Sequence, residues 1–224
     1  MLNRFVEEHL RDYLTNLYQQ DIEGKEDIKH LYDITANQIY ATPYIVNRAL
    51  PHIGECFAVA DPFILLDIGG ATTDIHYSKD LVEDNLMTEN EYDRLVFKRL
   101  GVYKSRQSLV LAAQGNEFVY ELLTYLKVTE KIFTEQSERA TRVLMQLAIF
   151  LVLYKMSRYG QAYVNLALLA VNSIVFTGGI TKVLSIEDIE TIIAFFYRKI
   201  LTSEHRPAAI LDSDYQIWTL GMEV

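Results

Sequence analysis

Cysteine is nearly absent, since Cys56 is the one cysteine among 224 residues. A lone thiol cannot form an internal disulfide, and it cannot by itself complete a cysteine-rich zinc site or an iron–sulfur cluster. Disulfides are typical of oxidising compartments, so a chain without them is expected in a reducing, cytoplasmic location.

Positive charge and long apolar runs are also scarce. The chain has 21 Lys and Arg against 30 Asp and Glu, a formal net charge of −9. Such a surface repels phosphate backbones, so we expect no nucleic-acid partner. The longest apolar run, residues 143–154, contains Gln146 and is shorter than the roughly 20 residues that cross a bilayer. Charged residues within the first 20 positions argue against a signal peptide, and we expect no membrane association.

What the sequence does contain is an alternation of apolar segments with strand and helix character. Helical spacing predicts helices over residues 1–22, 42–56, 89–97, 105–113, 117–126, 135–158 and 185–201, and a short one at the C-terminus. Strands are expected at 63–66, 72–77, 172–176 and 208–211. This alternation predicts an α/β fold, a mixed sheet flanked by helices. We divide it into a helical preface with a connecting helix (1–58) and an α/β lobe (59–224) with a helical insertion at about 105–160.

One stretch, FILLDIGGATTDIHYS at residues 63–78, combines a buried strand, a glycine turn and a second strand. Asp67 ends the apolar strand, where an ionisable group is unfavourable unless it is used or paired. Gly69 and Gly70 would let backbone N–H groups approach an anion. An ordinary hairpin is the simpler interpretation of the glycine pair alone. The whole string favours a phosphate site, with Asp67 holding Mg²⁺ through water or orienting the attacking water.

A second stretch, SIVFTGGITKVL at residues 173–184, runs from a strand through Gly178 and Gly179 into a helix. It has neither the spacing of a P-loop nor that of the dinucleotide fingerprint, so Lys182 is interpreted as a solvated residue. Taken alone, the glycine pair favours close packing of a helix on a strand.

Together and in this order, the two stretches resemble the second phosphate motif and the adenosine motif of the actin-like ATPase superfamily. The resemblance implies a ribonuclease H-like fold that binds ATP and Mg²⁺ between two lobes. It places seven residues at the phosphates and three at the adenosine. The phosphate set is Asp67, Gly69, Gly70, Ala71, Thr72, Thr73 and Asp74, and the adenosine set is Gly178, Gly179 and Ile180.

Within this superfamily, DIGGATTDIH is most similar to the MutL family linked to cobalamin-dependent glutamate mutase, which is unrelated to the mismatch-repair protein of that name. FKRLGVYKS (97–105), LDSDYQIWTLGM (211–222) and, more weakly, ATPYIVNRAL (41–50) add to the resemblance. Lys98 and Arg99 stand where that family is expected to carry Gly-Asp, which puts an acidic contact in doubt. The hydantoinase and oxoprolinase family has a similar Asp-x-Gly-Gly stretch and stays open.

The first phosphate motif of the superfamily, an Asp-x-Gly strand end, has no counterpart before residue 61, where Gly24 and Gly54 are the only glycines. We therefore expect a second lobe alone, which binds nucleotide weakly and turns over slowly or not at all. Three functions remain open. They are half of an ATP-dependent reactivating chaperone for a cobalamin-dependent mutase, a silent interaction module, and a hydantoinase-type lobe. The expected partners are a first-lobe polypeptide or the mutase, and the chain could also form a homodimer.

Two single residues complete the predictions. His76 is interpreted as a strand histidine with satisfied ring nitrogens. Trp218, the only tryptophan, is expected to anchor the last helix in the core.

Overall fold

The structure is a computed structural model that describes residues 13, 17, 40, 42–78, 81, 92–158 and 167–223, with the backbone alone at Asp93. The chain divides into two compact units, Met1–Ile45 and Val46–Val224. In the first unit, the rings of Tyr40 and Tyr44 stack with centroids 5.9 Å apart. The helix predicted over 1–22 lies outside the described residues apart from Tyr13 and Leu17, which are both helical.

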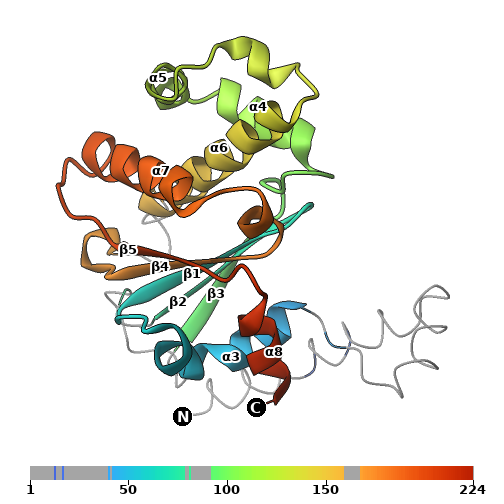
Figure 1. The fold of residues 1–224 in the computed structure, drawn as a ribbon, viewed down its shortest axis with the longest axis vertical. Coiled ribbons are helices and arrows are strands. Elements are labelled where there is room, and N and C mark those ends of the chain that lie inside the picture. The colour runs from blue at the N-terminus through green and yellow to red at the C-terminus, as the bar shows by residue number, and fades with distance from the viewer. Residues whose placement is uncertain are drawn as a thin grey trace, which may run out of the picture. The chain divides into compact units, whose positions relative to one another are not determined.

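The second unit is built on a five-stranded mixed sheet with the strand order β3-β2-β1-β4-β5 (Figure 1). The strands are β1 (Phe63–Ile68), β2 (Thr73–Ser78), β3 (Tyr92–Phe97), β4 (Ser173–Thr177) and β5 (Ala208–Leu211). β1 pairs antiparallel with β2 and parallel with β4, so it is the central strand. β2 pairs antiparallel with β3, and β4 pairs parallel with β5. The expected mixed sheet flanked by helices is confirmed.

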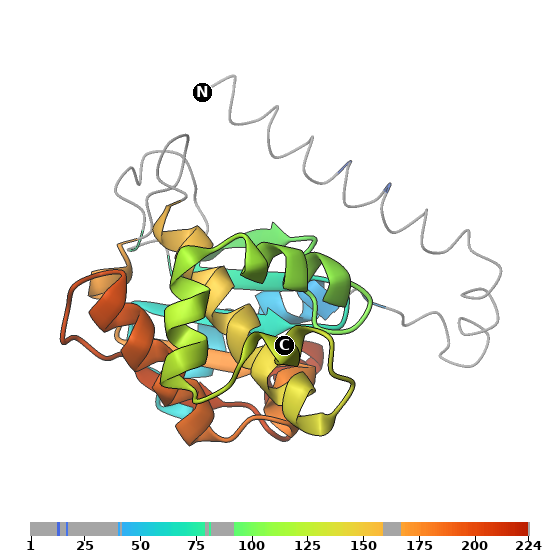
Figure 2. The same cartoon turned by 90° about the horizontal axis from the view of Figure 1, so that it is seen from above.

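The two faces of the sheet are covered by different helices, as the two ribbon views show (Figures 1 and 2). Because strand side chains alternate, Ile64, Leu66 and Ile68 of β1 face the larger core, which contains α4 (Arg106–Gln114), α5 (Glu117–Tyr125), α6 (Glu138–Ser157) and α7 (Ile186–Lys199). Phe63 and Leu65 face a smaller core. The smaller core is covered by the part of α3 (Thr42–Phe57) from Val46 onward and by α8 (Gln216–Glu223).

The helix α6 explains the longest apolar run of the sequence. Ser137 caps its N-terminus by accepting a hydrogen bond from the backbone N–H of Ala140 at 3.1 Å, as expected of an N-cap serine. Among the described residues, α6 is the one helix long and apolar enough to cross a membrane, but 72% of its apolar window is buried inside the protein. The helix is therefore a core helix, as the sequence predicted.

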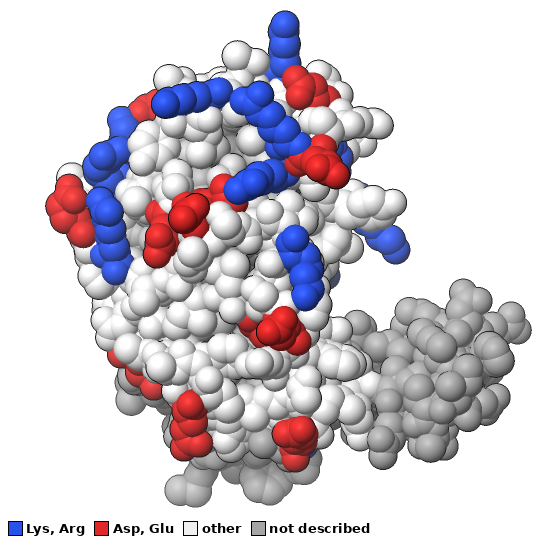
Figure 3. Space-filling model, in the orientation of Figure 1, with Lys and Arg blue, Asp and Glu red and all other residues white. Residues whose placement is uncertain are grey.

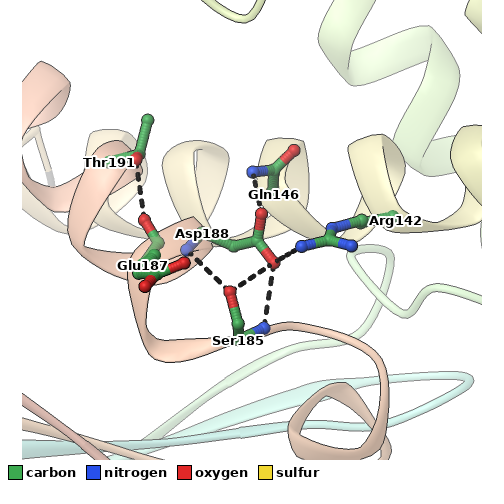
Figure 4. A network of polar contacts seen from close by, with 6 residues as sticks. All are labelled: Arg142, Gln146, Ser185, Glu187, Asp188 and Thr191. Carbon is green, nitrogen blue, oxygen red and sulfur yellow. Dashed lines mark hydrogen bonds and ion pairs between the residues drawn. The ribbon is translucent and has the colours of Figure 1, made fainter.

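Helices α6 and α7 are held together by a network of polar side chains around Asp188 (Figure 4). Ser185 and Asp188 form a capping box at the start of α7, which satisfies N–H groups that the helix leaves free. The Asp188 carboxylate also accepts hydrogen bonds from Arg142 at 2.5 Å and from Gln146 at 3.3 Å. We call these four residues the α6–α7 brace.

Two predictions of local structure are wrong. The segment predicted as a helix over 89–97 contains the strand β3, whose Leu95 and Phe97 pack on the core while Arg94 and Val96 are exposed. Trp218 does not anchor α8, because its side chain is 45% exposed and Ile217 is the buried residue of that turn.

Candidate functional site

The two glycine corners of the sequence lie side by side at the carboxyl ends of β1 and β4. Asp67 pairs in register with Thr177, the residue that precedes Gly178. Gly178 has φ +83°, and a Cβ on it would overlap Oδ1 of Asp67. The Asp67 carboxylate therefore lies directly over the bare Cα of Gly178, an approach that only glycine permits.

The first corner is a tight turn over residues 69–72, closed by a hydrogen bond from the Gly69 N–H to the Thr72 carbonyl at 3.0 Å. The segment after β3 donates hydrogen bonds to the carbonyl oxygens of this turn. The Val102 N–H donates to the Gly69 carbonyl at 3.1 Å, and the Tyr103 N–H donates to the Gly70 carbonyl at 2.9 Å. The Ser105 hydroxyl donates to the third carbonyl, that of Ala71, at 2.6 Å.

Although its carbonyl groups are bound, the 69–72 turn has two backbone N–H groups without an acceptor among the described residues, those of Gly70 and Ala71. Both residues are exposed. Consecutive unpaired N–H groups in a turn form a concave site that suits an anion.

The side chains that follow the turn point in alternate directions. Thr73 is fully buried and its hydroxyl donates to the Leu100 carbonyl at 3.2 Å. Thr72 is only half-buried, and its hydroxyl donates to Asp74 Oδ2 at 3.3 Å. Of the predicted hydroxyl donors, Thr72 therefore lies on the open side, while Thr73 fastens the turn to the next loop.

Asp67 and Asp74 are cross-strand partners with different surroundings. Asp74 is buried and accepts hydrogen bonds from Nε of Arg94 at 2.8 Å and from Nη2 of the same guanidinium. For the half-buried Asp67, the structure shows no hydrogen-bond donor among the described residues. Burial and, to a smaller extent, the charge of Asp74 raise the pKa of Asp67 to about 6 against the opposing charge of Arg94.

In the second corner, the two glycines differ. Gly178 must lack a Cβ because the Asp67 carboxylate lies against its Cα. A Cβ on the exposed Gly179 would meet nothing within 4 Å. Ile180 is fully buried in the core and contributes only its backbone to the corner. Lys182 donates to the Ser213 carbonyl and lies over the Tyr215 ring at 4.8 Å, so it is turned away from the corner. The open space thus lies over Gly179.

Sequence reasoning missed two residues beside the corners, Asp212 and Arg94. Asp212, 1% exposed, accepts a hydrogen bond from the Thr177 hydroxyl at 2.9 Å and caps α8 through the N–H groups of Gln216 and Ile217. Arg94 was missed because its segment has helical spacing. The position of Asp212 shortly before a predicted helix could have identified it as a helix cap.

His76 is buried, but its ring is not satisfied as predicted. Neither ring nitrogen has a hydrogen-bond partner. Burial and, to a smaller extent, the positive charge of the neighbouring Arg94 lower the pKa of His76 to about 3. The ring is therefore neutral at physiological pH and adds no charge to the site.

The charges around the site are sparse. Among the described residues, no group of three or more His, Cys, Asp or Glu side chains could hold a metal ion. On the face drawn in Figure 3, Lys and Arg side chains gather over the upper helical part, and the middle of the face is mostly uncharged. A single carboxylate, Asp67, fits Mg²⁺, because this ion keeps most of its waters and commonly takes one or two carboxylates and phosphate oxygens.

A family model and several solved structures are similar to this chain. The family model described as "MutL protein" matches residues 1–222. This match extends the resemblance, which the sequence motifs carried from residue 41, to the N-terminal segment. A comparison with curated proteins returned no match.

Three solved structures are similar to the chain. They are the ethanolamine utilization protein EutJ from Carboxydothermus hydrogenoformans (17% identity, TM-score 0.36), the activator of 2-hydroxyisocaproyl-CoA dehydratase from Clostridium difficile with bound ADPNP (12%, 0.38) and a non-polymerisable quadruple mutant of pCBH ParM (15%, 0.39). The matches cover 81%, 81% and 79% of this chain, and 53%, 64% and 51% of those proteins. The chain thus spans between about half and two thirds of their length.

Proposed function

Because the chain belongs to the MutL family, we propose that it is the nucleotide-binding half of an ATP-dependent reactivating chaperone for a cobalamin-dependent mutase. One observation carries the proposal. The Asp67 carboxylate, the N–H groups of Gly70 and Ala71, and the open backbone of Gly179 meet at the ends of two neighbouring strands. Carboxyl ends of strands are where α/β sheets bind ligands.

Each group has a defined part in this proposal. The Gly70 and Ala71 N–H groups would bind phosphate oxygens, while the Thr72 hydroxyl proton is donated to Asp74. The adenosine lies on Gly179, where no side chain intervenes. Asp67 would hold Mg²⁺ through water or orient the attacking water, and a bound Mg²⁺ would supply positive charge to the phosphates. Since Ile180 is buried, only its backbone can contact the nucleotide.

This lobe supplies one side of the site. Phosphoryl transfer depends on positioning and on charge stabilisation from both sides of the phosphate. The sequence carries no second Asp-x-Gly corner, so we propose that the lobe binds Mg–ATP weakly and does not turn it over alone. A first-lobe polypeptide, or the mutase, would complete the site. The exposed Cys56 thiol is compatible with a reducing cytoplasm.

Titration calorimetry with Mg–ATP and with the non-hydrolysable Mg–ADPNP tests the proposal. We expect binding of both nucleotides by the wild-type chain, and Asp67→Asn should abolish the dependence of affinity on Mg²⁺. The matched control is Asp214→Asn, which removes an exposed carboxylate from the turn before α8. Absence of heat and of any thermal shift with either nucleotide would favour a silent interaction module instead. Hydrolysis that depends on an amide substrate would favour the hydantoinase-type alternative.

A further inference from the structure

The Asp74 carboxylate connects the 69–72 turn to the edge strand β3. One of its oxygens accepts the Thr72 hydroxyl at 3.3 Å, and the other accepts Nε of Arg94 at 2.8 Å as well as Nη2 of the same group. The Asp74 side chain is 8% exposed, whereas that of Arg94 is 37% exposed. A buried carboxylate is thus neutralised by a cation that reaches in from the surface.

The charge of Asp74 matters because of its position. It pairs across the strands with Asp67 and is two residues from the turn. Without Arg94, two carboxylates would face a phosphate at this corner, and at short range in a partly buried site such repulsion is strong. The nearby His76 is neutral and cannot replace the guanidinium.

We propose that Arg94 is a positioning residue for the phosphate: it neutralises Asp74 and holds that carboxylate on the Thr72 hydroxyl, so that an anionic phosphate can lie at Gly70 and Ala71. This inference rests on the proposed nucleotide site and adds to it a residue outside both glycine motifs. Arg94 does not contact the nucleotide; it acts through Asp74.

A double-mutant cycle separates this role from simple support of the fold. Arg94→Gln leaves Asp74 charged and unpaired, so we expect Mg–ADPNP affinity to fall on the order of tenfold or more. Asp74→Asn removes the charge that needs neutralising and should weaken binding less. The double variant Arg94→Gln, Asp74→Asn should regain affinity relative to Arg94→Gln alone, because no uncompensated carboxylate then remains beside the phosphate. A loss of affinity in Arg94→Gln that exceeds any loss in its free energy of unfolding distinguishes this role from support of the fold. Arg94→Lys, which keeps the charge, should retain most of the affinity.

The control variant is Arg198→Gln, which removes the same group from α7, where the guanidinium lies over the Tyr125 ring. It should bind nucleotide as the wild type does. Wild-type affinity in Arg94→Gln, or a double variant as weak as Arg94→Gln, would overturn the proposal.

A second readout does not need nucleotide. The Gly69 N–H closes the turn, so its hydrogen exchange should accelerate in Arg94→Gln and stay slow in Arg94→Lys. If the wild-type chain binds no nucleotide, the proposed function fails. Faster Gly69 exchange would then still support the positioning of the turn by Arg94, and unchanged exchange would overturn it.

Discussion

Two carboxylates of the same unit, Asp67 and Asp188, have opposite surroundings. In the α6–α7 brace, Asp188 accepts hydrogen bonds from Arg142, Gln146, and both the N–H and the hydroxyl of Ser185 (Figure 4). Partial burial alone would raise the pKa of Asp188, but the hydrogen bonds from Arg142 and Ser185 outweigh it and lower that pKa. At the glycine corner, burial and the charge of Asp74 raise the pKa of Asp67 to about 6, and no described residue donates to it.

The comparison distinguishes a carboxylate that stabilises the fold from a carboxylate that remains available to a ligand. A carboxylate with all its hydrogen bonds satisfied by the protein has nothing left for a ligand. A carboxylate held over bare backbone with a raised pKa is unfavourable for the empty protein, and such groups are concentrated at functional sites. The predictions below test this difference.

The largest effect is expected from Gly178→Ala. A Cβ here would overlap Oδ1 of Asp67 and would sit on a residue with φ +83°. Strain in the left-handed region and overpacking together should lower the free energy of unfolding by about 3 kcal/mol or more, measured by urea denaturation. Gly179→Ala is the matched control, since its Cβ meets nothing within 4 Å. Equal losses in the two variants would mean that the Asp67 carboxylate does not lie on Gly178.

Smaller changes in the free energy of unfolding are expected from replacing Asp188 and Asp67, and these changes should have opposite signs. Asp188→Ala loses the capping box and the hydrogen bond from Arg142, so the free energy of unfolding should fall by about 2 kcal/mol. Asp67→Asn removes an unsatisfied, partly buried charge, so the free energy of unfolding at pH 7.5 should rise by about 1 kcal/mol. If Asp67→Asn destabilises the protein as Asp188→Ala does, Asp67 is a structural residue and the contrast fails.

Much of the fold could be predicted from the sequence, because its inner strands are short apolar runs that end in glycine turns. The strands that begin at residues 63 and 173 were predicted in this way, and helical patterns predicted α6 and α7. The segment YDRLVF was taken for a helix because Tyr92, Leu95 and Val96 have helical spacing. An edge strand packs only one face on the core, so its apolar pattern is weak and tertiary pairing with β2 decides its structure.

The convergence of the two glycine corners could be predicted from the sequence, but the side-chain directions there could not. Two inner strands that end in glycine corners are expected to meet at one sheet edge, and Asp67 and Gly178 do so. Strand alternation could have shown that Thr73 points away from Asp74. The role of Arg94 could not be found, because it depends on the register of β3 against β2, in which Arg94 lies opposite His76.

The smallest expected effect is on the pH dependence of the free energy of unfolding. The contributions of Asp67 and His76 to it have opposite signs and nearly cancel in the wild type. Between about pH 4 and 6, folded Asp67 still binds a proton that the unfolded chain has released, so this group makes stability fall as pH rises. His76 has the opposite sign, because its pKa of about 3 in the fold lies below the ordinary value of 6.5, so its contribution is lost as pH falls through this range.

Asp67→Asn should therefore show stability that rises with pH, by at most about 1.4 kcal/mol per unit, and His76→Leu should show stability that falls. Urea denaturation of both variants from pH 4 to 7 measures the slopes, with Asp214→Asn as the control. Slopes of equal sign in the two variants would show that the carboxylate at the glycine corner is not held in the raised-pKa state that separates it from Asp188.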